Sequence, residues 1–276
     1  MSGSTGFQMP DFTWFVGRVE DVLDPKKAGR VRVRCEGYHA DKSKLPTEQL
    51  PWALISSTVM SASLDGVGES PHGLLKGTQV WGFFLDGRSA QQPCVIGSLM
   101  GESKNNDGVD VSKIARGDNS QIKNDLKQSK GFAEPKSPYK PVYPDNKVIY
   151  TPSGHTIEID DTKGAERIHV RHKSGSFTEF HTDGTVVHKA KKDKYTFVYA
   201  NEFIHVDGNV NMVVNGNVSQ IIGGNLKQQV GGNWQVNVSG SWKCTVGGSA
   251  NIQVGGSTKV QSGGQYTNKA SRISLN

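Results

Sequence analysis

The chain has 276 residues, a formal net charge of +6, 34% hydrophobic residues and 33 glycines. This length allows two ordinary domains, and the composition is lean for a compact globule yet too regular in pattern for disorder. The sequence contains no run of about 18 apolar residues that could span a membrane. The three cysteines, Cys35, Cys94 and Cys244, lie too far apart to predict a disulfide framework or a zinc site. The first residues lack the layout of a secretory signal, so we expect the protein to be made in the cytoplasm and to stay soluble there.

Residues 1–100 are predicted to form an OB-type β-barrel domain, because five short apolar or alternating segments within about 85 residues suit that fold. These segments are Trp14–Val22, Arg30–Glu36, Trp52–Ser56, Gln79–Leu85 and Cys94–Leu99.

One strand of this barrel raises the hypothesis of single-stranded nucleic-acid binding. Arg30, Arg32 and Arg34 share a face near aromatic residues (Trp14, Phe15 and Tyr38), and OB barrels bind single strands with such groups. Four acidic residues flank the arginines, and the domain carries no net charge. We therefore favour a solvated or protein-docking face and expect no nucleic-acid partner; the acidic residues are Glu20, Asp21, Asp24 and Glu36.

Residues 101–146 are predicted to be a linker, with a short helix near Val111–Ile114, because polar residues and four prolines dominate the segment. Residues 147–207 are again rich in strands separated by turns that contain glycine. We expect them to form a wider, less regular start of the region that follows. The expected strands are Val148–Tyr150, Thr156–Asp160, Arg167–His172, Ser176–His181, Thr185–Lys189 and Tyr195–Tyr199.

Residues 208–276 repeat with a period of eight, and this repeat is the most specific signal in the sequence. Within each unit, apolar residues alternate with polar ones, as in Val210, Met212 and Val214, which indicates a strand with one dry face. Each glycine is predicted to mark a corner, where the backbone needs a positive φ or approaches a neighbour closely. The repeat glycines are Gly208, Gly216, Gly224, Gly232, Gly240, Gly248, Gly256 and Gly264.

An eight-residue unit is too short to form a whole coil of a single-chain solenoid, which usually needs about 20 residues or more. Three chains wound together would give every strand hydrogen-bonded neighbours and a shared dry core. The predicted fold class is therefore all-β, with an OB-fold barrel followed by an intertwined trimeric triple-stranded β-helix. Residues 208–276 also carry five basic and no acidic side chains, which fits either a plain solvated surface or a rod that approaches an anionic surface.

Several segments resemble the central spike of T-even-type contractile phage tails, and the similarity runs in order along nearly the whole chain. The spike's OB domain is matched by WFVGRVEDVLDPKKAGRVRVR (14–34), LPTEQLPWALI (45–55) and GTQVWGFFLDG (77–87). The start of its triple-stranded β-helix is matched by TPSGHTIEIDD (151–161) and ERIHVRHKSGS (166–176), and its shaft by the VxGxxxxx repeats. The VgrG spikes of type VI secretion share this plan.

The resemblance implies a homotrimeric structural protein of the virion, located in the tail baseplate and assembled in the host cytoplasm. Its OB end would bind a baseplate hub protein, and its shaft would pierce the host cell envelope. The T-even spike carries a lysozyme domain between barrel and shaft, whereas this chain has only residues 101–146 at that place. We therefore expect no enzyme activity, no catalytic residues and no cofactor.

Two groups of residues could suggest chemistry, and for both we favour a structural interpretation. Glu158, Asp160 and Asp161 come closest to the pair of carboxylates that glycoside hydrolysis needs. Five histidines have no zinc-ligand spacing, so no metal ligand is predicted, although three copies of one histidine could hold an ion on a trimer axis. These are His155, His169, His172, His181 and His188.

At the C-terminal end, the eight-residue pattern weakens from Ser262 onwards, and residues 265–276 contain neither histidine nor cysteine. We expect a small cone-shaped tip protein of the PAAR-repeat type to cap this end. Three alternatives to the phage spike stay open: a VgrG-like secretion spike, an OB-fold single-stranded nucleic-acid-binding protein with a trimerising tail, and a spike with an unrecognised hydrolase activity.

Overall fold

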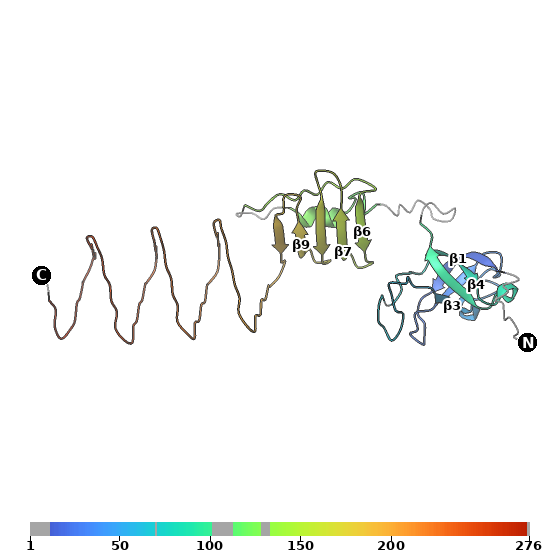
Figure 1. Ribbon diagram of the computed structural model, residues 1–276, viewed down its shortest axis with the longest axis horizontal. Helices are drawn as coiled ribbons and strands as arrows, with labels where there is room; N and C mark the ends of the chain where they lie inside the picture. Colours follow the sequence, from blue (N-terminus) through green and yellow to red (C-terminus); the bar gives the residue numbers. More distant parts are fainter. Residues whose placement is uncertain (1–11, 70, 101–112, 128–132, 275–276) are drawn as a thin grey trace, which may run out of the picture. The chain divides into compact units, whose positions relative to one another are not determined.

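The computed structural model describes residues 12–69, 71–100, 113–127 and 133–274. Its regular elements are nearly all β-strands, and the one α-helix among the described residues has six residues (Figure 1). In the part of the chain that is described, no helix is both long enough and apolar enough to cross a membrane.

The N-terminal part is a closed five-stranded barrel with strand order β1-β2-β3-β5-β4, in which only β3 and β5 pair in parallel. This architecture confirms the predicted OB-type barrel. Short 3-10 helices at Thr47–Gln49 and Gly87–Ser89 join some of the strands. The strands are β1 (Trp14–Asp21), β2 (Val31–Cys35), β3 (Trp52–Ile55), β4 (Gln79–Phe84) and β5 (Pro93–Ser98).

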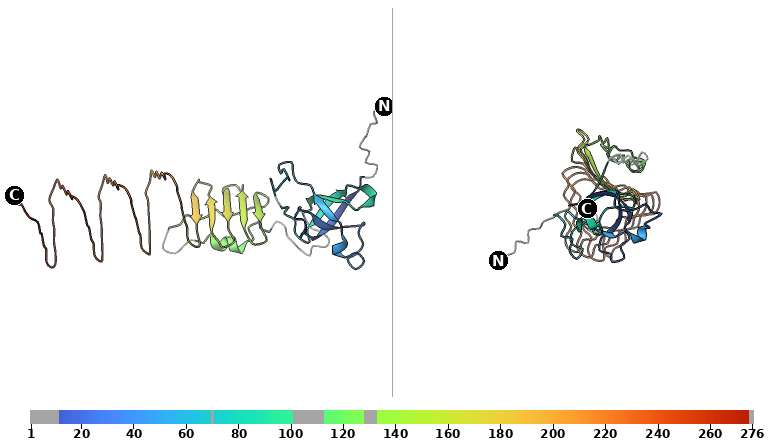
Figure 2. Two further views of the ribbon diagram at one scale, coloured as in Figure 1. Left: turned by 90° about the horizontal axis from the view of Figure 1, so that it is seen from below. Right: turned by 90° about the vertical axis from the view of Figure 1, so that its right-hand side faces the viewer.

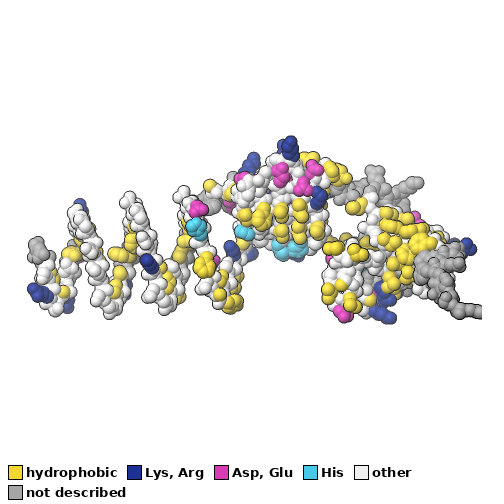
Figure 3. Space-filling view, in the orientation of Figure 1, with side chains coloured by type: hydrophobic (Ala, Val, Ile, Leu, Met, Phe, Trp, Pro, Cys, Tyr) yellow, Lys and Arg dark blue, Asp and Glu magenta, His cyan; other side chains and the backbone are white. Residues whose placement is uncertain are grey.

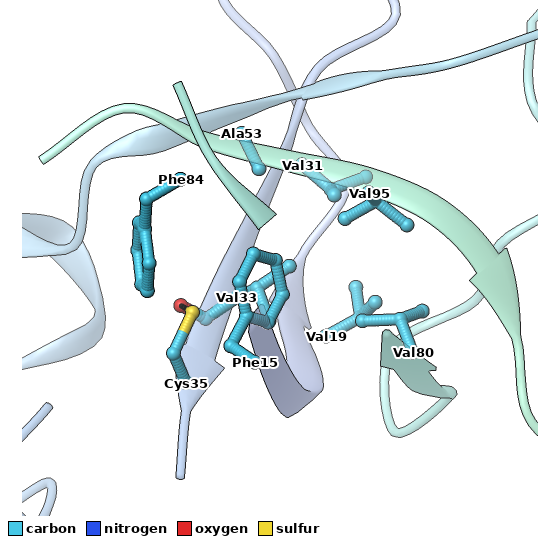
Figure 4. Packing of buried hydrophobic residues seen from close by; sticks show 9 residues of the cluster. All are labelled: Phe15, Val19, Val31, Val33, Cys35, Ala53, Val80, Phe84 and Val95. Carbon is cyan, nitrogen blue, oxygen red and sulfur yellow. Dashed lines mark hydrogen bonds between the residues drawn. The ribbon is translucent and has the colours of Figure 1, made fainter. Parts of the chain in front are cut away.

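Alternation of side chains along these strands fills the barrel with a small apolar core (Figure 4). Along β2, for example, the side chains of Val31, Val33 and Cys35 are completely buried, whereas the arginines between them are only half-buried. Gly82 is required where β4 passes β5, because a Cβ there would lie 2.0 Å from the carbonyl oxygen of Cys94. The barrel therefore satisfies both its hydrogen bonds and its apolar side chains within one chain.

A second sheet is an antiparallel meander in which five strands pair in sequence order. Five of the six strands expected in this region are found, but Tyr195–Tyr199 forms no strand, so that prediction was wrong for the isolated chain. The strands are β6 (Asn146–Tyr150), β7 (Thr156–Asp160), β8 (Arg167–Arg171), β9 (Phe177–Phe180) and β10 (Val186–Lys189).

Part of the expected linker lies against one face of this sheet (Figures 1 and 2). We call residues 113–127 and 133–145 the strap. The strap contains helix α1 (Ser120–Asp125), where Asn119 accepts hydrogen bonds from the first turn and Ile122 is completely buried. The expected helix near Val111–Ile114 is not found in its described part, and Val111 lies outside the described residues. Local capping at Asn119 and burial of Ile122 place the helix later in the chain.

Residues 190–274 form no strand and instead run in straight arms between bends (Figures 1 and 2). The bends fall on residue pairs that recur every eight positions, from 191–192 to 263–264. All of these residues are exposed, and in this range no backbone–backbone hydrogen bond is found in the described structure. We call residues 190–274 the shaft.

Candidate functional surfaces

Each of the eight repeat glycines lies in the second position of a bend of the shaft. None of the eight has a positive φ, and a Cβ on any of them would meet no atom within 4 Å. The glycines were expected either to adopt a positive φ or to allow close approach of a neighbour. The first of these two reasons is wrong for the single chain. Close approach of a neighbouring chain stays a prediction.

The eight-residue period begins earlier than the glycines do. The bends at residues 191–192 and 199–200 have Lys192 and Ala200 where the later repeats have glycine. A bend of this kind thus tolerates a Cβ, at least at the start of the shaft. The sequence analysis missed these two units because it identified the repeat by its glycines. Val198, two residues before Ala200, matches the Val or Ile of the later repeats and could have indicated the earlier start.

Hydrophobic side chains stand in a regular series along the shaft. The residue two positions before each repeat glycine is Val or Ile in the first seven units, from Val206 to Val254. Together with Val198, these side chains are the least exposed large apolar ones of the shaft, at 42–52%, whereas Trp234 and Ile252 reach 72% and 87%. A series of this length without an apolar partner indicates a surface that other chains cover.

The sheet β6–β10 is amphipathic, and its open face is the apolar one. Neighbours in register along this face include Ile149, Ile157 and Val170, and also Ile159, Ile168 and Phe180. Hydrophobic side chains form rows across the sheet (Figure 3). Each of these six side chains is 42–66% exposed. The open face therefore has the composition of a core that lacks its second layer.

The opposite face of the sheet is charged and buried beneath the strap. Arg167 donates to Glu179 at 3.1 Å and to Glu158, and all three side chains are at most 1% exposed. Arg171 donates to Asp125 of the strap, and Lys189 donates to Glu134 at 2.9 Å. These contacts hold the strap on the sheet, so the segment is not a free linker over these residues.

Glu179 is the centre of this buried network. His169 Nδ1 lies 3.0 Å from one of its carboxylate oxygens, and His181 Nε2 lies 2.8 Å from the other. Burial opposes ionisation of Glu179, but hydrogen bonds from His169 and Ser137 and the charge of Arg167 outweigh it and lower the pKa of Glu179 to about 2. The carboxylate is therefore an anchor of the folded state rather than a group that exchanges protons near neutral pH.

The carboxylates considered for hydrolysis do not share an open site. Glu158 and Asp160 are buried on the polar face, and Thr162 donates to Asp160 through its backbone N–H and its hydroxyl. Asp161 is exposed and pairs with Lys147 at 2.6 Å. General acid–base catalysis needs carboxyl groups that a substrate can reach, so the geometry favours the structural interpretation of these three residues.

The histidines are dispersed in a similar way. His169 and His181 contact Glu179, while the rings of His155 and His172 lie 4.5 Å apart at a turn end of the sheet. His155 accepts a hydrogen bond from the backbone N–H of Lys173, so its lone pair at Nδ1 is already used. Among the described residues, no group of three or more His, Cys, Asp or Glu side chains is arranged to hold a metal ion.

The arginines on this face of the barrel form ion pairs with carboxylates of the same domain. Arg30 donates to Asp24 at 2.7 Å and holds the pKa of that carboxyl well below its usual range. Arg34 donates to Glu20 at 2.6 Å, and this contact lowers the pKa of Glu20. Guanidinium groups engaged in this way offer little free charge to phosphates.

The aromatic neighbours of these arginines also differ from those expected. Trp14 stacks on Trp81 at 5.3 Å, and Tyr38 contacts Phe84. Trp52 lies beneath Arg30 and Arg32 instead. The sequence alone did not reveal Trp52, because its position depends on the register in which it faces Arg32 across β2 and β3.

Comparisons with known proteins agree with this arrangement of barrel and repeat. The family model of the Gp5 N-terminal OB domain matches residues 35–113, and that of the Gp5 C-terminal repeat matches residues 216–239 in three copies. Protein Gp5 of Vibrio phage KVP40 is 32% identical over 265 residues, covering 73% of this chain and 63% of that protein. The chain is similar to the phage Gp5 proteins.

The chain also matches the pre-baseplate central spike protein Gp5 of Enterobacteria phage T4, with 46% identity over 82 residues. That match covers 28% of this chain and 14% of the T4 protein. The chain thus spans less than two thirds of the length of the KVP40 protein and of the T4 protein. The expected resemblance to contractile-tail spikes is confirmed.

Proposed function

We propose that the chain is the central spike of a contractile phage tail baseplate and acts as a homotrimer. The observation that carries this proposal is the shaft, in whose described residues no backbone–backbone hydrogen bond is found and every apolar side chain is exposed. Backbone groups left without partners in a dry core would cost free energy comparable to lost hydrogen bonds. Two further copies, wound in parallel with the first, would supply the partners for every arm.

The open face of the sheet β6–β10 supports the same assembly. Three such faces, packed around one axis, would bury their isoleucines, valines and Phe180 against one another, while the charged faces with their straps would point outwards. Apolar burial of this kind stabilises by about 25 cal/mol per Å².

The mechanism of a spike is mechanical. A ladder of interchain hydrogen bonds around a dry core resists bending, so that force applied at the barrel end would reach the tip and the host cell envelope. In this proposal the barrel end binds the baseplate hub. A PAAR-type tip protein at residues 265–276 stays a prediction, supported by the weaker repeat there.

The role as a structural protein without enzyme activity belongs to the proposal as well. Its support is the burial of Glu158 and Asp160 on a face covered by the strap. A peptidoglycan-clearing assay on the full-length protein tests it. Clearing that is abolished by Glu158→Gln would contradict the structural interpretation.

Light scattering of the purified full-length chain tests the trimer. We expect a mass of about three times the 29.9 kDa of one chain, whereas a monomeric mass would contradict the proposed architecture. Immunogold labelling of tails from particles that carry the chain then tests the location. Label at the baseplate is expected, and label elsewhere on the particle, or none in purified tails, would contradict a spike role.

A further inference from the structure

The buried face beneath the strap carries more negative than positive charge. Three carboxylates, those of Glu158, Asp160 and Glu179, are at most 2% exposed, and one guanidinium, that of Arg167, serves them. Arg171 does not add to the balance, because Asp125 of the strap neutralises it. Counted over these carboxylates and this guanidinium alone, the cluster has an excess of two negative charges. An uncompensated buried charge costs several kcal/mol, so a counter-charge is needed.

The two buried histidines form their ion-pair contacts with only one carboxylate of the cluster. His169 and His181 both contact Glu179, which lies on β9. Asp160 lies on β7, and its hydrogen-bond donors are the backbone N–H and hydroxyl of Thr162, which carry no charge. His169 also lies opposite Glu158 across β7 and β8, but among the described residues only Arg167 forms an ion pair with the buried carboxylates of β7.

Side-chain oxygens without hydrogen-bond partners gather on this same side. They are Oε1 of Glu158, Oδ2 of Asp160 and Oδ1 of Asn146, and all three residues are at most 2% exposed. Asn146 lies directly opposite Asp160 across β6 and β7 and shares its buried face. Side chains paired in this way have Cβ atoms about 5 Å apart, so the amide oxygen and the carboxylate can reach a common ligand.

Tyr139 of the strap contributes a fourth oxygen. Its ring covers the guanidinium of Arg167 at 4.6 Å, and its hydroxyl is buried without a hydrogen-bond partner. Burial, together with the nearby charges of Glu158 and Asp160, raises the pKa of Tyr139, so the hydroxyl keeps its proton. The strap thus closes the oxygen-rich side of the sheet.

We propose that Asp160, Asn146, Glu158 and Tyr139 form a binding site for a hard divalent cation of the Ca²⁺ type. Two positive charges match the excess of two negative charges, and Ca²⁺ takes carboxylate, amide and water oxygens in flexible numbers. Mg²⁺ fits less well, because it keeps several of its waters. Soft metals are disfavoured, since the free atoms on β6 and β7 are oxygens. The site does not depend on the spike role, and failure of either proposal would leave the other intact.

Terbium luminescence on the full-length protein tests direct binding. Tb³⁺ replaces Ca²⁺ at oxygen sites, and Tyr139 lies where it can transfer excitation energy to the ion. We expect a sensitised signal that Ca²⁺ displaces, and its loss in Asp160→Asn. The matched control is Asp161→Asn, which alters the exposed neighbouring carboxylate and should leave the signal unchanged.

Thermal unfolding provides a second readout that does not depend on luminescence. After removal of metals by a chelator, millimolar Ca²⁺ should raise the unfolding temperature of the sheet by roughly 5 °C, and Mg²⁺ should raise it less. Tyr139→Phe keeps the ring over Arg167 and removes only the hydroxyl, so it should fold and show a smaller Ca²⁺ shift.

The proposal would be overturned if Ca²⁺ shifted neither the luminescence nor the unfolding temperature of the wild-type chain, because protons would then balance the charge and water would bind the unpaired oxygens. An Asp160→Asn variant that kept the full Ca²⁺ response would overturn it as well. If that variant failed to fold, the comparison between Tyr139→Phe and Asp161→Asn would decide: equal Ca²⁺ shifts would contradict the site.

Discussion

The barrel and the shaft differ in whether hydrogen-bond and packing partners for their residues lie within the same chain. In the barrel, five strands close on themselves, and core residues such as Phe15, Val33 and Phe84 are at most 3% exposed. In the shaft, every residue from 190 to 274 is exposed. The difference teaches that regular alternation alone does not make a folding unit. A segment folds alone only if its hydrogen-bond and packing partners lie within reach in the same chain.

The sheet β6–β10 combines the two situations, one on each face. Its charged face is covered within the chain, because the strap supplies Asp125 and Glu134 as partners of Arg171 and Lys189. Its apolar face is open, like the shaft. A polar interior under the strap together with an open apolar face is the reverse of the arrangement in a soluble single-chain sheet.

The largest expected effect is the loss of all shaft structure when the chains separate. In a denaturant titration at several protein concentrations, the barrel should unfold at a midpoint that does not change with concentration. The shaft transition should move to higher denaturant as concentration rises, because association stabilises it. A single transition without concentration dependence would show that the shaft folds within one chain.

A charge on the open face of the sheet should come next. Ile168→Asp would place a carboxylate in the proposed trimer core, at a cost above about 3 kcal/mol per chain, and trimers should be lost in light scattering. Leu23→Asp is the control: Leu23 is 82% exposed, more than the 46% of Ile168, and its replacement should change stability by about 0.5 kcal/mol or less. Intact trimers of Ile168→Asp would show that this face is not an interface.

Substitution of one repeat glycine should have a smaller but selective effect. Gly232→Val adds a side chain that nothing in the single chain opposes, so any damage must arise from neighbouring chains. We expect a several-fold lower trimer yield than for Ser241→Ala, measured by gel filtration. Equal yields would indicate that these glycines, like Ala200 at its bend, are not needed for close approach.

The last expected effect, which is absent near neutral pH, is acid destabilisation of the sheet through Glu179. Its pKa in the folded chain is about 2, below the ordinary value of 4.5, so its stabilising contribution is complete above pH 4.5 and is lost as the pH falls towards 2. The loss should reach roughly 3 kcal/mol, measured by hydrogen exchange at β8 and β9.

The Glu179→Gln variant should remove most of this pH dependence, while replacement of the exposed Glu36 by Gln should not. An unchanged acid response in Glu179→Gln would assign the effect to other carboxylates. The barrel should be insensitive to both substitutions of this pair in the acid range, which separates sheet stability from barrel stability.

The sequence by itself determined the barrel, five strands of the second sheet and the period of the shaft. These features depend on local signals: alternation of apolar residues, glycine turns and a fixed spacing of eight. It also indicated that Glu158 and Asp160 share a strand face, because side chains two residues apart in a strand must do so.

Only the tertiary structure decided which face of the sheet is covered and by what. Nothing in the alternation of Thr156–Asp160 or Arg167–Arg171 shows that the charged side is the buried one, because contacts of the strap with Arg171 and Lys189 span 46 and 55 residues. The same holds for Trp52 beneath Arg32, which depends on strand register. Local patterns fix the period and the face of a strand, whereas the partner of each face is set by contacts between residues far apart in the chain.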